Sequence, residues 1–202
     1  MPRYRTRSWR AFDPRPAAAA GPPAIAANLR ILGLDPGSRR TGFGVIECRG
    51  AAYAHVAHGC IAVAGLALAQ RLRAIFEGLE KLIAEYGPTE VAVERVFVNR
   101  NVDSALKLGQ ARGAALCAVP HGVAVYEYAP RAIKLALVGS GAAEKLQVAH
   151  MIRTLLRLDG KIAPDASDAL AIAVCHAHAR QLQALAFGYT DGIDARARAG
   201  QT

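Results

Sequence analysis

The order of the apolar patterns along residues 29–185 is the feature that most constrains the fold of this chain. Three strand-like segments come first, "LRILGLD", "TGFGVIEC" and "AYAHVAHGCIAV", and the last two are joined by a turn at residues 49–51. Helical and strand-like periods then alternate. They predict a helix over 65–87, a strand over 90–98, a helix over 101–119, a strand over 122–130, and helices over 130–138, 143–158 and 165–185. This order predicts an α/β domain with a mixed sheet of five strands flanked by helices.

The two ends of the chain lack this periodicity. Residues 1–28 are rich in Arg, Pro and Ala, which predicts a disordered tail, although a transit peptide or a misassigned start site would have the same composition. Residues 29–186 are expected to form one folded domain, and residues 187–202 a flexible C-terminal tail. The chain has no run of eighteen apolar residues, so no membrane span is predicted.

The charge of the chain favours a polyanionic partner, but weakly. The formal net charge is +9, with 25 basic and 16 acidic residues. The first thirty residues hold six of the arginines and one acid, which leaves 19 basic and 15 acidic residues and a charge of +4 in the remainder. The four cysteines form no CxxC pair, and we expect them to be small buried residues in a reducing compartment.

Four carboxylates stand where ordinary packing explains them poorly. Asp35 ends an apolar strand just before a Pro-Gly turn, and Glu94 interrupts the strand "VAVERVF". Asp165 and Asp168 are three residues apart at the start of a helix that is apolar almost all round. Taken singly, each has a simpler explanation: a turn residue, a surface position, or an acid favoured by the helix dipole. Taken together, they predict a site for divalent cations, since Mg²⁺ prefers carboxylate oxygens.

Longer blocks carry a family resemblance. "GLDPGSRRTGFGVI", "VERVFVNRNVDSALKLGQARG", "EYAPRAIKLALVGSGAAEK" and "DASDALAIAVCHAH" resemble, in this order, the RuvC family of Holliday-junction resolvases. The resemblance implies a ribonuclease-H-like fold and a magnesium-dependent endodeoxyribonuclease that nicks two opposed strands of a four-way DNA junction. By position, Asp35, Glu94, Asp165 and Asp168 match the catalytic, metal-binding acids of the family, which hold two Mg²⁺ ions per site, with Mn²⁺ as a substitute.

The resemblance also implies residues that contact DNA. Phe97 matches an aromatic residue that stacks at the junction, although a core aromatic is the alternative. The basic residues of the family match Lys134 and Lys145, and the weaker candidates are Arg39, Arg95 and Arg100.

As family members act as homodimers beside a branch-migration motor complex in the bacterial cytoplasm, the same is expected of this chain, with no membrane partner. Targeting of residues 1–28 to an organelle is the alternative location. Three other functions stay open: a ribonuclease-H-like nuclease that cuts RNA, an actin-like ATPase, and a junction-binding protein without catalysis. The block "DSALKLGQARG" argues against the first, the chain length against the second, and the full set of acids against the third.

Overall fold

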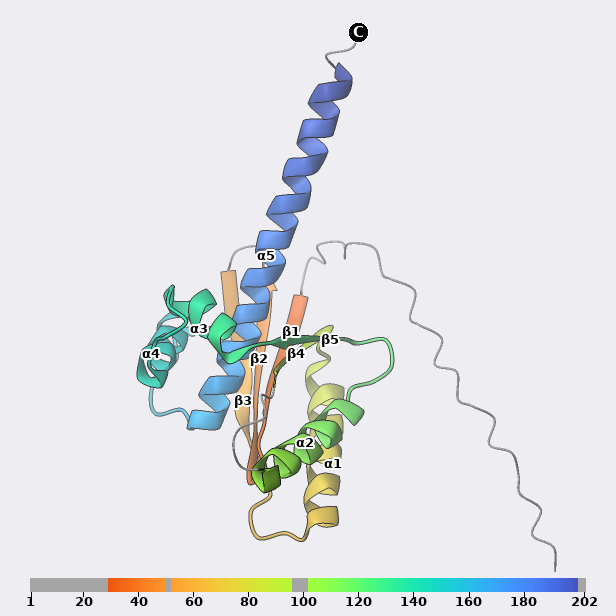
Figure 1. Ribbon diagram of the computed structural model, residues 1–202, viewed down its shortest axis with the longest axis vertical. Coiled ribbons are helices and arrows are strands. Elements are labelled where there is room, and N and C mark those ends of the chain that lie inside the picture. Colours follow the sequence, from red (N-terminus) through yellow and green to blue (C-terminus); the bar gives the residue numbers. More distant parts are fainter. Residues whose placement is uncertain (1–28, 50–51, 96–101, 200–202) are drawn as a thin grey trace, which may run out of the picture.

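The computed structural model describes residues 29–49, 52–95 and 102–199, with the side chains described up to residue 185. Within these residues, five strands form one sheet in the order β3-β2-β1-β4-β5 (Figure 1). The strands are β1 (Leu29–Pro36), β2 (Arg40–Arg49), β3 (Ala52–Ala62), β4 (Glu90–Glu94) and β5 (Ala124–Tyr128). β1, β2 and β3 pair antiparallel, whereas β4 and β5 continue the sheet in parallel beside β1. The predicted mixed five-stranded sheet is confirmed.

Helices cover both faces of this sheet (Figure 1). The helices are α1 (Leu68–Tyr86), α2 (Val102–Cys117), α3 (Pro130–Val138), α4 (Lys145–Leu156) and α5 (Pro164–Ala199). Side chains alternate along a strand, so Ile31 packs with α3, α4 and α5, while its neighbour Leu32 packs with α1 and α2. Both are fully buried, which contributes about 1.5–3 kcal/mol each to folding.

Two predicted bounds differ from the observed elements. β4 ends at Glu94 rather than at residue 98, and residues 96–101 lie outside the described residues. α5 is much longer than the predicted helix over 165–185, since it continues to Ala199 and runs past the end of the sheet (Figure 1). No helix among the described residues is both long enough and apolar enough to cross a bilayer.

Close contact between α5 and the sheet depends on glycine. Gly33 and Gly44, on β1 and β2, face α5, and a Cβ atom on either would collide with its backbone. The missing side chains let the helix axis approach the central strands directly. The first turn of α5 therefore lies against the end of β1 and β2, where the predicted acids are found.

Candidate active site

Two of the predicted acids come from neighbouring strands. In the parallel pairing of β1 with β4, Leu34 lies opposite Val93, so Asp35 and Glu94 follow at the next position of each strand. Leu34 and Val93 face α1 and α2. Because side chains alternate, Asp35 and Glu94 project from the opposite face, toward α5.

The other two acids come from the start of α5. Pro164 is the first residue of this helix, a position that suits its fixed φ and missing N–H, as the sequence predicts. Asp165 lies in the first turn, and Asp168 follows one turn later on the same side. Gly42 pairs with Asp35 across β1 and β2 and contacts the carbonyl oxygen of Asp165. The structure thus brings the four predicted acids to one end of the sheet.

The electrostatics of Asp35 reflect this crowding. The pKa of Asp35 is raised from 3.8 to about 7, first by burial and then by the charges of Glu94, Asp168 and Asp165, while Lys145 opposes the rise. The pKa of Glu94 is raised for the same two reasons, burial and Asp168. Carboxylates held this close favour either a shared proton or a cation between them.

Lys145 supplies positive charge to the four acids. Its Nζ donates to Oδ2 of Asp168 at 2.8 Å, and this contact raises the pKa of the ammonium group. The side chain of Lys145 is otherwise 79% exposed. Lys134, half-buried on α3, is near enough to lower the pKa of Glu94. Both predicted lysines therefore lie beside the acids, although they are eleven residues apart.

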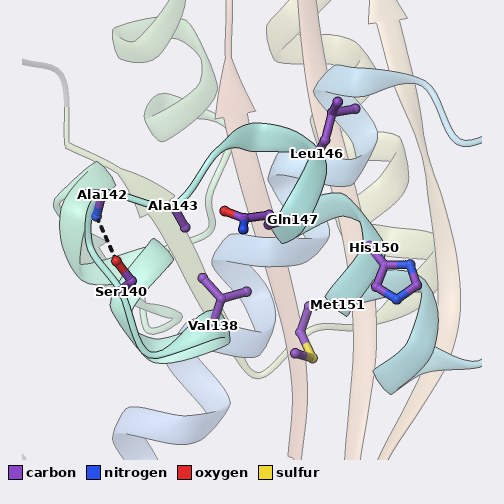
Figure 2. A pocket seen from close by; sticks show the side chains of 8 residues that line it. All are labelled: Val138, Ser140, Ala142, Ala143, Leu146, Gln147, His150 and Met151. Atoms are coloured by element: carbon purple, nitrogen blue, oxygen red, sulfur yellow. Dashed lines mark hydrogen bonds between the residues drawn. The ribbon is translucent and has the colours of Figure 1, made fainter.

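The turn between α3 and α4 sets the position of Lys145 (Figure 2). α3 ends at Val138 and is followed by Gly139, whose φ of 73° is left-handed, and the Ser140 hydroxyl oxygen accepts the Ala142 N–H at 3.4 Å. Glu144 and Gln147 then cap α4 reciprocally, so Lys145 becomes the first residue of the helix. A cavity beside this turn has a volume of about 570 Å³ and a largely apolar lining that includes none of the four acids. Figure 2 shows the eight side chains that line it.

The remaining predicted DNA contacts are more dispersed. Arg39 is exposed in the turn between β1 and β2. Arg95 follows β4 and forms an ion pair with Glu127 at 3.7 Å. Glu127 also binds Arg112, at 2.6 Å. Phe97 and Arg100 lie outside the described residues, and so do residues 1–28.

A buried polar network at the other end of β4 is absent from the sequence predictions. His176 on α5 is 1% exposed; its Nε2 lies 2.7 Å from Oε2 of Glu90, and its Nδ1 lies 2.6 Å from the hydroxyl of Tyr128. Arg180 binds the other oxygen of Glu90 at 2.7 Å. Glu90 and Glu94 share the parity of one strand, and this was the available signal that both lie on the same face of the sheet. The network joins β4, β5 and α5 and explains His176 as a structural residue.

The cysteines only partly match their prediction. Cys48 and Cys175 are buried, and burial raises their pKa values to about 11 and about 12. Cys60 is half-buried, and Cys117 is exposed, so the expectation that all four are buried is wrong. Cys117 ends α2 on the side away from the core, whereas Ala111 and Ala115 occupy the inner side.

The donor chemistry of the four acids fits a hard divalent cation. No group of three or more His, Cys, Asp or Glu residues in the described parts of the chain already has the spacing of metal ligands. However, Asp35 and Glu94 are partly buried among like charges, and the lysine that compensates them is bound to Asp168 alone. A divalent cation held by carboxylate oxygens would relieve this repulsion.

Comparisons with known proteins agree with the family resemblance of the sequence. The family model for crossover junction endodeoxyribonuclease RuvC matches residues 31–176. The crossover junction endodeoxyribonucleases RuvC of Methylococcus capsulatus and Alkalilimnicola ehrlichii are each 56% identical to the chain, over 75% and 77% of it and over 92% and 94% of their own lengths.

Solved structures give the same result. The structure of Thermus thermophilus RuvC in complex with a Holliday junction substrate superposes with a TM-score of 0.73 at 33% identity, covering 77% of this chain and 96% of that one. The yeast mitochondrial Holliday junction resolvase, at 11% identity and a TM-score of 0.58, shares the fold. The chain has the ribonuclease-H-like fold predicted for it, and it belongs to the RuvC family of crossover junction endodeoxyribonucleases.

Proposed function

We propose that this chain resolves four-way DNA junctions in recombination and repair by cutting two opposed strands symmetrically. The observation that carries the proposal is the convergence of Asp35, Glu94, Asp165 and Asp168 at one end of the sheet, with Asp35 at the centre of their repulsion. Family membership supports the junction as substrate, since the related T. thermophilus protein was solved with one.

The four acids hold the metal in this proposal. Membership of the RuvC family implies the use of divalent metal, and the all-carboxylate donor set favours two Mg²⁺ ions, with Mn²⁺ as a substitute. When bound, such ions supply water activation and neutralise charge on the reacting phosphate, which gives 5′-phosphate and 3′-hydroxyl ends. Asp35, on the central strand between Glu94 and the α5 pair, would hold metal together with the acids on both sides of it.

The lysines bind the DNA backbone. Lys145 and Lys134 face the acids from α4 and α3, so they neutralise phosphates close to the point of cleavage. Arg39 and Arg95 are further backbone contacts. Phe97 and Arg100 remain predictions from the family resemblance, Phe97 as the ring that stacks on a base at the crossover.

The active form is a homodimer, because a two-fold junction needs two equivalent sites. The outer side of α2 supports this assembly. Val102 and Leu106 are 77% and 59% exposed there, and the space around Gly109 and Gly113 is open. An apolar stripe with two small residues lets the α2 helix of a second subunit approach closely. The two-fold axis through this contact would then relate the two active sites. A branch-migration motor complex accompanies the dimer, as the family resemblance implies. The bacterial relatives and the free cysteines support a location in the bacterial cytoplasm.

The test is magnesium-dependent cleavage of a mobile four-way junction, with linear duplex and an RNA–DNA hybrid as competing substrates. Wild type, Asp35→Asn and the control Asp159→Asn, an exposed loop residue, are compared after folding and junction binding are verified. Paired nicks at the junction that are lost only in Asp35→Asn support the proposal. Preferred cutting of the hybrid would favour the RNA-directed alternative, and binding without cleavage in any divalent metal would favour the non-catalytic one.

A further inference from the structure

A second cavity adjoins the four acids, of which it shares Asp165. It has a volume of about 480 Å³, within the range of ligand-binding pockets, and opens between the β1–β2 turn and the start of α5. Its lining residues are Gly37, Ser38, Arg39, Arg40, Ala64 and Asp165. Asp165 belongs both to this cavity and to the acids around Asp35, so a ligand in the cavity would be continuous with one at the acids.

The backbone of the β1–β2 turn is closely fitted. The Cα of Gly37 lies against the carbonyl oxygen of Arg40, and a Cβ atom there would collide with it. The carbonyl oxygen of Arg39 accepts the N–H of Val63 at 3.0 Å, and this bond ties the turn to the end of β3. The backbone at Arg39 and Arg40 is therefore fixed in position, while the side chains of both arginines are exposed.

The charges of this turn are uncompensated within the described part of the chain. Neither Arg39 nor Arg40 forms an ion pair with a described residue, whereas Arg49, at the other end of β2, binds Glu47 at 2.7 Å. Two adjacent guanidinium groups with free donors match the oxygens of a phosphate group, which they can bind in a bidentate manner. The Ser38 hydroxyl group is a third donor on the same wall.

We propose that this cavity binds the backbone phosphate next to the scissile one, on the strand being cut, through Arg39 and Arg40. The proposal rests on the proposed function, and it adds Arg40 and a defined substrate position to it. A strand whose scissile phosphate lies at Asp35 and Asp165 must continue past one side of the acids, and the cavity is the polar opening that shares Asp165. The two arginines thereby fix the register of the strand, and the acids act on the phosphate that this register presents.

The experiment uses junctions in which the phosphate immediately 5′ or immediately 3′ of the scissile one is replaced by an uncharged methylphosphonate. Affinity is measured in EDTA over a range of salt concentrations, for wild type, the double variant Arg39→Gln/Arg40→Gln, and the control Arg49→Gln. The double variant should bind the unmodified junction about tenfold more weakly. Its plot of log affinity against log salt should lose about one unit of slope.

The modified junctions identify the phosphate itself. One of the two methylphosphonates should weaken wild-type binding by the same factor of about ten. It should hardly change the affinity of the double variant, because the arginines that bind this phosphate are already absent there. Arg39→Lys/Arg40→Lys should recover most of the salt slope but little of the bidentate affinity. Equal unfolding midpoints exclude a structural cause, and the single variants replace the double variant if it does not fold.

Two results separate this proposal from the proposed function. In the first, wild type cuts the junction, but neither methylphosphonate weakens its binding, or a methylphosphonate weakens the binding of wild type and of the double variant equally. The cavity is then not the phosphate site, and the proposed function stands. If wild type neither cuts nor prefers the junction, the proposed function itself fails.

Discussion

Gly42 on β2 lies in direct contact with the main-chain carbonyl oxygen of Asp165 on α5, and no side chain fits between them. The same glycine is the strand partner of Asp35. A residue with no reactive group thus controls the spacing between two of the four acids.

Gly42→Ala should reduce cleavage far more than it reduces folding. The added methyl group overlaps a backbone atom, so the first turn of α5 must shift away from Asp35. We expect a loss of stability of about 1–3 kcal/mol and a cleavage rate at least about 100-fold lower. Single-turnover kinetics and urea unfolding measure the two effects. The control is Gly78→Ala in α1, where the methyl group meets the side chain of Ile61 rather than backbone; stability should change by no more than about 1 kcal/mol and cleavage should be unchanged. Full activity in Gly42→Ala would contradict this role.

The contribution of Asp35 to the stability of the metal-free protein should decrease as the pH rises from about 4 to about 7. The pKa of Asp35 is about 7 in the folded protein and near 3.8 when unfolded, so between these values the folded state alone keeps the proton. The resulting stabilisation, a few kcal/mol, is complete below the lower value and lost above the upper one. The raised pKa of Glu94 acts in the same direction.

Asp35→Asn tests this pH dependence. In urea unfolding with EDTA, the variant should be more stable than wild type at pH 8 and similar to it at pH 4, whereas Asp159→Asn should follow wild type throughout. Addition of Mg²⁺ at pH 8 should stabilise wild type and leave Asp35→Asn nearly unchanged. Identical wild-type and Asp35→Asn stabilities at pH 8 would show that the acids do not repel one another.

Lys145→Gln should bind divalent metal more tightly in the absence of DNA. The ammonium group of Lys145 is bonded to Asp168, so a cation must compete with it for that carboxylate. Titration calorimetry with Mn²⁺ should give an affinity up to about tenfold higher than for wild type. Junction affinity should fall at the same time, since a phosphate contact is lost. Lys161→Gln, on an exposed loop, is the control, and weaker Mn²⁺ binding by Lys145→Gln would contradict the competition.

Leu106→Glu should convert the proposed dimer into a folded monomer. Leu106 is 59% exposed on the outer side of α2. The carboxylate of the new glutamate therefore costs little free energy in a single subunit, but much when it is buried between two apolar stripes. Leu135→Glu, at a residue that is 57% exposed on α3 across the sheet, is the matched control. Analytical ultracentrifugation gives the mass, and the junction assay should show single rather than paired nicks. A dimeric Leu106→Glu protein would place the interface elsewhere.

Glu90→Gln should destabilise the protein without changing cleavage per folded molecule. The substitution leaves Arg180, which is 12% exposed, without its carboxylate and weakens the bond to His176. The expected loss is about 3 kcal/mol, against less than about 1 kcal/mol for Glu77→Gln, which removes an exposed pair with Arg73. Glu90 begins β4 and Glu94 ends it, so the acids should keep their geometry. Urea unfolding and single-turnover cleavage separate the two effects.

The sequence predicts the local elements well because each strand and helix has its own period. It does not predict their neighbours in space: nothing in the period of residues 90–94 says that β4 inserts beside β1 rather than at an edge. The alternation in β4 left Glu94 free to face either side, since both faces of the sheet are covered. The partnership of Glu90 with His176, 86 residues away, depends entirely on that insertion.

The four acids were predicted from their types and the family resemblance, but the glycines that bring them together were not. A glycine in a strand ordinarily indicates a bulge or a weak position, and only the path of α5 explains those in β1 and β2. The continuation of α5 to Ala199 was likewise missed, because residues 186–199 have no regular apolar period that a buried helix would show.

The close approach of α5 to glycines at residues 33, 42 and 44 also determines which parts of the gene can vary. In a library of all single substitutions selected for junction cleavage, intolerance should not be confined to residues with chemistry. The three glycine codons should be as depleted as the aspartate codons, and even alanine should fail there, whereas positions on the exposed side of α1 should accept most residues. The missing methyl group at these glycines should thus limit substitution as strongly as the carboxylates do.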